Sequence, residues 1–108
     1  MITKSQILTF KSSADSLYLA KDFTSATILY FKTWFALQDF ILLEKTGQSP
    51  KDHTERFRFL EKYFPKTYLK LDKEFSTYRD TYSKIIEKSV CDRIKKIIED
   101  EIRTYSII

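Results

Sequence analysis

The stretch ILYFKTWFALQDFILL, residues 28–43, is the most apolar part of the chain, and Lys32, Gln38 and Asp39 interrupt it. It lies in a predicted helix of about residues 25–46 that is apolar on nearly every side, so neighbouring elements must cover several of its faces. A membrane span needs about 20 mostly apolar residues without such charges. We therefore expect a core helix with no membrane contact, and a homodimer that buries its remaining surface.

Further helices are predicted on both sides of this segment. Apolar residues recur at spacings of three and four after Thr3, Asp52, Pro65 and Ser89, which is the period of a helix that buries one face. Gly47 marks the end of the central helix, because glycine is the usual residue in a left-handed C-cap. The 108 residues are expected to form a single all-α domain, an up-and-down four-helix bundle with an additional short helix.

Two capping boxes predict where helices begin. The pairs Thr3 with Gln6 and Asp52 with Glu55 have the required spacing of three residues. In such a box the side chain of each residue accepts a hydrogen bond from the backbone N–H of the other. The central helix is expected to start at Thr24 or Ser25.

The composition is that of a helical globular domain. One glycine and two prolines are too few turn residues for an all-β protein of this length. The net charge is +4, and residues 51–79 carry eight Lys or Arg against five Asp or Glu. Such an excess attracts phosphate weakly, and it is also typical of a solvated helix face. With no signal-peptide pattern at the N-terminus, a cytoplasmic protein is expected.

Residue counts exclude several classes of site. A single glycine cannot form the Gly-rich dinucleotide or P-loop motifs, which need several positions without a Cβ atom. One histidine and one cysteine cannot supply the four N or S ligands of a usual zinc site. Cys91, the single cysteine, excludes an internal disulfide and is expected to be a small buried residue. We expect no cofactor and no metal.

Several segments, taken in order, are similar to parts of one known helical family. The segments are Ala14–Tyr18, Asp22–Ala26, Tyr30–Leu37, Lys45–His53, Leu60–Phe64 and Tyr78–Tyr82. Together they resemble the HEPN family: its first helical pair, the following loop in which a glycine and a histidine recur, its third helix, and the arginine-to-tyrosine signature of a later helix. The resemblance covers about residues 10–103, nearly the whole chain.

The resemblance implies a helical bundle that is usually dimeric and is often encoded beside a small nucleotidyltransferase as a toxin–antitoxin-like pair. Many members are endoribonucleases whose motif is an arginine, four to six residues and a histidine. From Arg79 the histidine would fall at Lys84, Ile85 or Ile86, so this sequence departs from the motif. Because RNA cleavage needs a general base or a group that stabilises charge near the 2′-OH, we expect a HEPN-like module that binds a nucleotide or RNA without cutting it and has no catalytic residue.

Arg79, Tyr82 and Tyr78 are the first candidates for nucleotide or phosphate binding. On one continuous helix Arg79 and Tyr82 share a face, and Tyr78 extends it. A guanidinium flanked by phenols can hold a phosphate and stack on a base. In the alternative interpretation the tyrosines are core or interface aromatics, and Arg79 pairs with Asp80 or Glu87.

His53, Arg56 and Arg58 are the second group of candidates. They cluster at the start of the third predicted helix, where backbone N–H groups and the helix dipole favour an anion. The alternative is an ordinary helix start with solvated charges.

Two other functions fit the sequence. One is a metal-independent endoribonuclease with a divergent active site, in which Arg79, Tyr82 and His53 are brought together in the dimer. The other is a tetratricopeptide-like interaction scaffold, because residues 14–37 also resemble one such helix pair. That scaffold requires a second copy at a period of about 34 residues, and residues 48–108 contain none.

Overall fold

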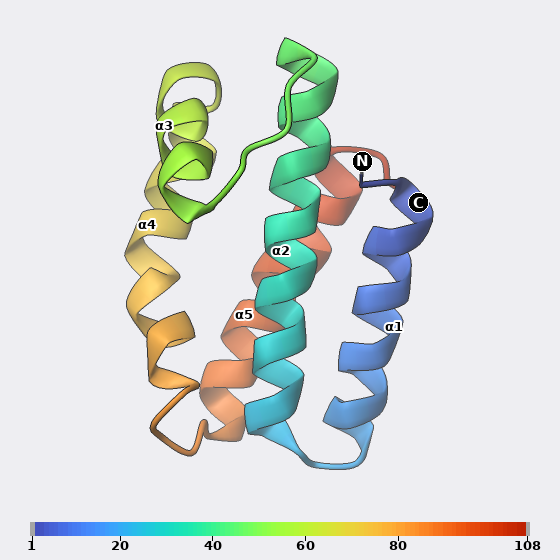
Figure 1. The fold of residues 1–108 in the computed structure, drawn as a ribbon. Coiled ribbons are helices and arrows are strands. Elements are labelled where there is room, and N and C mark those ends of the chain that lie inside the picture. The colour runs from blue at the N-terminus through green and yellow to red at the C-terminus, as the bar shows by residue number, and fades with distance from the viewer. Residues whose placement is uncertain (1, 108) are drawn as a thin grey trace.

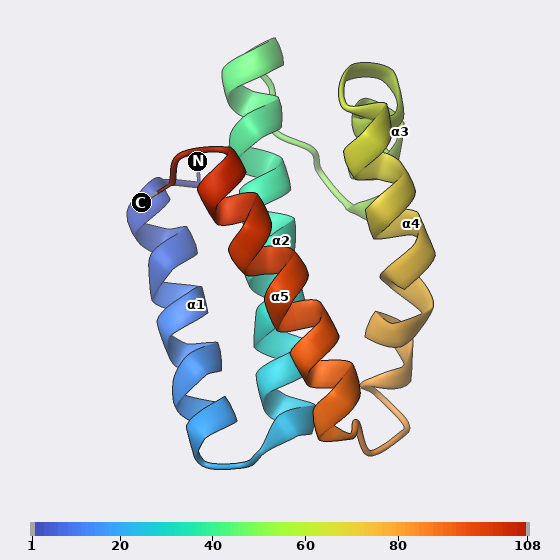
Figure 2. The ribbon, with the colours of Figure 1, turned by 180° about the vertical axis from the view of Figure 1, so that it is seen from behind.

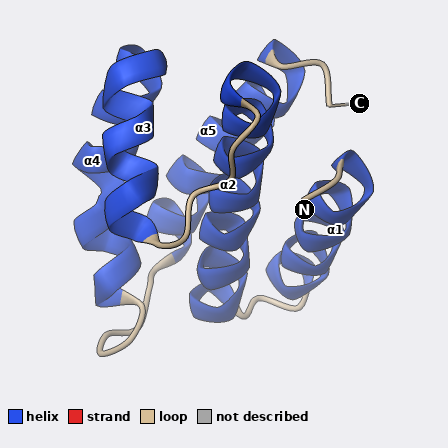
Figure 3. Ribbon diagram, turned by 45° about the horizontal axis from the view of Figure 1, so that its top comes forward, coloured by secondary structure: helices blue, strands red, loops and turns tan. Residues whose placement is uncertain are grey.

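The computed structural model describes residues 2–107 and contains five α-helices (Figure 1). They are α1 (Lys4–Leu19), α2 (Phe23–Thr46), α3 (His53–Tyr63), α4 (Pro65–Asp80) and α5 (Lys88–Thr104). The described residues form helices and loops without a strand (Figure 3). The Cα radius of gyration, 13.3 Å, is that of a folded domain of about 100 residues. The predicted all-α helical bundle is confirmed.

Helix α2 is the centre of the fold and contacts each of the other four helices. In both views α1 lies on one side of α2 and the α3–α4 hairpin lies on the other, while α5 runs behind α2 in Figure 1 and in front of it in Figure 2. Tyr30, Phe31, Trp34, Leu37 and Leu42 of α2 are fully buried. A single chain therefore covers most of the apolar segment, as a helix with so little polar face requires.

Consecutive helices alternate in direction except at one step, from α2 to α3, which run the same way (Figures 1 and 2). The pairs α1–α2 and α3–α4 are antiparallel, whereas α3 and α5 run in the same direction as α2 (Figures 1 and 2). The loop of residues 47–52 returns along the side of α2 before α3 begins (Figure 1). This return places the N-terminus of α3, and not its C-terminus, beside the middle of α2.

Local capping chemistry sets most helix ends where the sequence predicts them. At the start of α1, Gln6 N donates to Thr3 Oγ1 and Thr3 N donates to Gln6 Oε1, which completes the capping box. Gly47 has φ +74° and donates its N–H to the Leu43 carbonyl at the end of α2, the left-handed cap that favours glycine. Pro65 is the first residue of α4, where its missing N–H has no cost.

Three helix starts differ from the prediction in detail. Helix α5 begins at Lys88, one residue before the predicted Ser89, and its N-cap residue Glu87 makes no capping side-chain hydrogen bond. Asp22 accepts a hydrogen bond from Ser25 N, so α2 begins at Phe23, before Thr24 and Ser25. Asp52 caps α3 by accepting from Glu55 N. The Glu55 carboxylate accepts a hydrogen bond from the N–H of Lys51, one residue before Asp52, and not from the N–H of Asp52 itself. The caps of α2 and α3 still satisfy an exposed N–H of the first helical turn.

Long side chains connect the outer helices to α5. Lys11 of α1 pairs with Glu99 of α5 at 3.0 Å, and Arg93 of α5 binds both carboxylate oxygens of Glu74 of α4 at 3.0 Å. These ion pairs bridge helices that pack mainly on other elements, since α1 and α5 pack mainly on α2 and α4 packs mainly on α3.

Helix α2 also has the length and composition of a helix that could cross a membrane, with a mean hydropathy of 1.2 over 18 residues. However, 67% of that window is buried inside the protein. A core helix has the same properties, so this is weak evidence for a membrane span.

Candidate functional site

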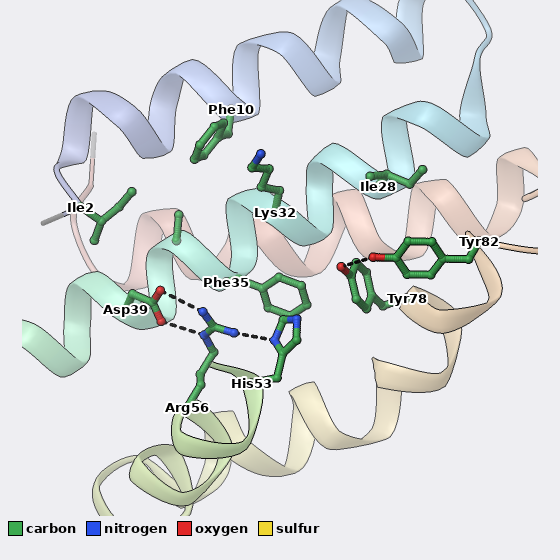
Figure 4. A pocket seen from close by; sticks show the side chains of 11 residues that line it. Ile2, Phe10, Ile28, Lys32, Phe35, Asp39, His53, Arg56, Tyr78 and Tyr82 are labelled. Atoms are coloured by element: carbon green, nitrogen blue, oxygen red, sulfur yellow. Dashed lines mark hydrogen bonds and ion pairs between the residues drawn. The ribbon is translucent and has the colours of Figure 1, made fainter. Parts of the chain in front are cut away.

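A groove follows the open side of α2, between α1 on one side and α3 with the end of α4 on the other (Figure 4). Its volume is about 470 Å³, within the range of small-molecule sites. We call it the α2 groove. Its lining residues are Ile2, Phe10, Ile28, Lys32, Phe35, Ala36, Asp39, His53, Arg56, Tyr78 and Tyr82.

The floor of the groove is one face of α2. Ile28, Lys32, Phe35 and Asp39 line it and follow each other at spacings of four, three and four residues, so they lie on one side of a helix. Lys32 and Asp39 are two of the polar residues that interrupt the apolar segment in the sequence. Sequence reasoning did not select them as site residues. The signal was present, because charged residues at helical spacing on an otherwise apolar helix mark an uncovered face.

Arg56 attaches α3 to this face of α2. Its Nε and Nη2 atoms donate to the two carboxylate oxygens of Asp39 at 2.7 and 2.9 Å, and its Nη1 donates to His53 Nδ1 at 2.5 Å (Figure 4). The guanidinium carbon also lies 5.1 Å from the centre of the Phe35 ring. The Arg56 and Asp39 side chains retain 10% and 22% of their exposure. Arg56 therefore lies at the predicted anion site, but its charge is already paired.

The surroundings of His53 favour its neutral form. Burial lowers the pKa of His53 below its ordinary value of 6.5, and the adjacent Arg56 guanidinium lowers it further, while the carboxylates of Asp39 and Asp52 act in the opposite direction. Because Nδ1 accepts a hydrogen bond from Arg56, the ring proton is assigned to Nε2. The imidazole therefore has no unoccupied basic lone pair.

Aromatic rings surround His53 on the other side. The Phe35, Phe75 and Tyr78 ring centres lie 4.7, 5.3 and 5.7 Å from that of His53, each in an edge-to-face arrangement. Edge-to-face pairs are favourable because the positive edge of one ring meets the negative face of the next. The imidazole is consequently held in one orientation.

Tyr78 and Tyr82 form the end of the groove (Figure 4). Their hydroxyl oxygens are 2.7 Å apart, and their rings meet edge to face at 5.5 Å. Burial, together with the hydrogen bond to Tyr82, raises the pKa of Tyr78 to about 12. Tyr78 is half-buried whereas Tyr82 is 74% exposed. The two tyrosines thus join the core to the rim of the groove.

Arg79 does not share a helix face with Tyr82, because α4 ends at Asp80 and Tyr82 lies in the following turn. The Arg79 side chain is exposed, and its guanidinium lies 5.9 Å from the centre of the Phe75 ring. Arg58 is exposed on α3. Neither arginine lines the α2 groove. The structure thus brings together four of the six candidates and leaves these two arginines outside.

Lys32 is the cation of the groove with no carboxylate partner among the described residues. Its ammonium lies 5.2 Å from the centre of the Phe10 ring (Figure 4), and the side chain is exposed. By contrast, the charge of Arg56 is neutralised by Asp39. The uncompensated charge of the groove is therefore one positive charge.

The other chemistry-bearing residue of the sequence is structural. Cys91 is fully buried, and burial raises the pKa of its thiol, so the predicted role as a small buried residue is confirmed. Within residues 2–107, no group of three or more His, Cys, Asp or Glu side chains has the geometry of a metal site.

Comparison with known proteins identifies no relative: the chain matches no protein-family model, no curated protein and no solved structure. The similarity to HEPN domains therefore rests on the sequence segments alone. A function has to follow from the residues of the groove.

Proposed function

We propose that this chain is a HEPN-like, non-catalytic domain that binds a nucleotide or an unpaired RNA base in the α2 groove. The observation that carries the proposal is the convergence of Tyr78, Tyr82, His53 and Arg56 on one groove, because these residues were selected from the sequence as two separate groups. A groove lined by aliphatic and aromatic side chains with a few polar groups is the usual form of a small-molecule site.

Tyr82 supplies a surface on which a base can stack. Its ring is 74% exposed at the rim, and the hydrogen bond and ring contact with Tyr78 hold it in place. Stacking of a base on an aromatic side chain contributes about 1–3 kcal/mol. Because the ring is already ordered, less side-chain entropy is lost on binding.

Lys32 supplies the charge that a phosphate needs. It is the unpaired cation of the groove, and an ammonium forms a charge-assisted hydrogen bond to a phosphate oxygen. One free cation matches one phosphate group. The groove therefore suits a mononucleotide, or one nucleotide of a longer strand.

The same geometry supports binding without cleavage. A general base needs a free lone pair within reach of the 2′-OH, and the Nδ1 lone pair of His53 is occupied by Arg56. Arg79, the arginine of the family-like signature, lies outside the groove lining. An endoribonuclease would have to rearrange both groups.

The homodimer and the small nucleotidyltransferase partner are parts of the same proposal. Most of α2 is covered by its own chain, so the surface left for a homodimer is the groove side, where Ile28 is 37% exposed. A ligand would then lie at the subunit interface. Sedimentation at about micromolar concentration tests the dimer, and a monomer would contradict it.

Binding is tested by calorimetric titration of the protein with AMP and with a short single-stranded oligoadenylate. Tyr82→Ala is expected to weaken binding by about 5- to 100-fold, the equivalent of one lost stacking contact. Lys32→Gln should weaken the binding of AMP more than the binding of adenosine, which is titrated alongside and lacks the phosphate. Tyr63→Ala is the matched control, because Tyr63 is a partly exposed tyrosine outside the groove. No binding of either ligand at about millimolar concentration, or equal binding by the Tyr82 variant, would refute the proposal.

Cleavage is tested separately with labelled RNA in metal-free buffer. The proposal expects intact RNA with the wild-type protein. Cleavage that disappears in Arg79→Ala would instead establish the endoribonuclease alternative.

A further inference from the structure

A second group of polar side chains lies inside the protein, where α5 packs against α2 (Figure 2). Glu101 of α5 is only 4% exposed, and Trp34 and Gln38 of α2 are fully buried. Gln38 Nε2 donates to Glu101 Oε2 at 3.4 Å, a long hydrogen bond. These residues take no part in the α2 groove.

The hydrogen bonding of this group is incomplete. Gln38 Oε1 and Trp34 Nε1 are both buried without a partner. Gln38 Oε1 is an acceptor, so it needs a donor, and an ionised carboxylate has none to offer. A carboxylic acid has one O–H, which can donate to the amide oxygen while the amide N–H donates back to the acid. A proton on Glu101 would therefore satisfy the unpaired oxygen of Gln38.

We propose that Glu101 is a buried proton-binding site, in which the carboxylic acid pairs with the Gln38 amide and the packing of α5 on α2 depends on keeping that proton. Loss of the proton leaves a buried negative charge whose nearby donors are the Gln38 amide, through one long hydrogen bond, and the Trp34 indole N–H, an arrangement that destabilises a folded protein.

The charges around Glu101 are consistent with this inference. Burial raises the pKa of Glu101 to about 7, while Lys70 of α4 and the Gln38 and Trp34 side chains act in the opposite direction. Helix α2 presents only these two neutral groups, and no group of α1 or α3 within residues 2–107 shifts the pKa of Glu101. On α5 itself, Asp100 is paired with Arg103 at 2.5 Å. Lys70 is thus the one opposing charge, and it does not outweigh burial.

The direction of the pH dependence follows from linkage. The pKa of Glu101 is higher in the folded chain than the ordinary value of 4.5, so the folded state binds the proton more tightly. Its contribution to stability is fully present below about pH 4.5 and is lost as the pH rises through about 7. Between about pH 5 and about pH 8, this site alone should raise the unfolding equilibrium constant by roughly 50- to 100-fold.

The test compares urea unfolding of the full chain at several pH values with that of Glu101→Gln. The substitution keeps the shape and is neutral at every pH, so the variant should lack this dependence and should be more stable than the wild type at about pH 8. Glu99→Gln is the control, and it should change the stability at about pH 8 in the opposite direction. Burial raises the pKa of Glu99, but hydrogen bonds from Lys95 and Lys11 outweigh it and leave the pKa below its ordinary value. The Glu99 variant should therefore be less stable than the wild type at about pH 8.

The protonation of Glu101 can also be measured directly in the folded protein, without an unfolding experiment. Carbon-13 NMR of the glutamate carboxyl groups should contain one resonance that is absent in Glu101→Gln and whose titration midpoint is well above 4.5. Trp34 is the only tryptophan, and its emission should change with the same midpoint. A Glu101 midpoint at the ordinary value, or parallel stability curves for the wild type and Glu101→Gln, would overturn the proposal.

Discussion

Replacing Arg56 by methionine tests whether the contact between α3 and α2 depends on the ion pair with Asp39. Methionine keeps much of the length of the side chain but removes both hydrogen bonds to Asp39 and the one to His53. The Asp39 carboxylate, which retains 22% of its exposure, then loses its counter-charge.

The size of the effect follows from the burial of the pair. Removing one partner of a fully buried ion pair costs about 3–5 kcal/mol. Because Asp39 keeps some contact with water, we expect the lower end of that range, about 3 kcal/mol. At about 4 °C per kcal/mol for a chain of this length, the melting temperature should fall by about 12 °C. The urea midpoint should fall by about 2 M for a slope of about 1.5 kcal/mol/M.

Trp34 makes the measurement direct, because it is the only tryptophan and is fully buried. Its fluorescence reports unfolding in urea without a label. Arg58→Met is the matched control: Arg58 lies on the same helix, is exposed and lines no part of the groove, so its loss should cost less than about 0.5 kcal/mol. A loss of less than about 0.5 kcal/mol for Arg56→Met, or an equal loss for Arg58→Met, would refute the reasoning.

Three further predictions concern single positions. His53 is the only histidine, so its proton NMR titration is unambiguous. The titration midpoint should lie below 6.5 in the wild type and should rise in Arg56→Met, because the carboxylates that favour the charged form of His53 remain. An unchanged midpoint would contradict the contact between Arg56 and His53. As the folded state binds this proton less tightly, the contribution of His53 to stability should be lost as the pH falls below about 6.5. Gly47→Ala should lower the free energy of unfolding in urea by about 1 kcal/mol. The cost is backbone strain at φ +74° and not a clash, since nothing lies within 4 Å of an added Cβ atom. An unchanged urea midpoint would contradict this strain. Leu42→Ala should cost about 2–5 kcal/mol, because Leu42 is fully buried, whereas Leu19→Ala, at 81% exposure, should stay within about 0.5 kcal/mol; similar losses would contradict the burial.

Elements that depend on neighbours in the sequence were predicted well. The box at Thr3, the left-handed cap at Gly47 and the new helix at Pro65 all depend on contacts within a few residues. The central helix followed from composition, since so apolar a segment can be stable in water only when other elements cover it.

The candidate site was predicted in part. His53 and Arg56 lie three residues apart, and Tyr78 and Tyr82 four, so each pair was visible in the sequence. Lys32, which lines the groove, was not predicted because in the sequence it stands only as an interruption of an apolar segment. Arg79 was included on the assumption that the helix continues to Tyr82, but α4 ends two residues before it.

The sequence by itself determined that the chain is helical, that residues 28–43 lie at the centre, and where most helices begin, because apolar period and capping act over one or two turns. Only the tertiary structure decided that Arg56 pairs with Asp39, seventeen residues away, and that Gln38 meets Glu101, sixty-three residues away. Each of these polar groups has many partners of suitable charge or hydrogen-bonding type in the sequence. The choice among them depends on which helix faces meet and on how little water remains between them.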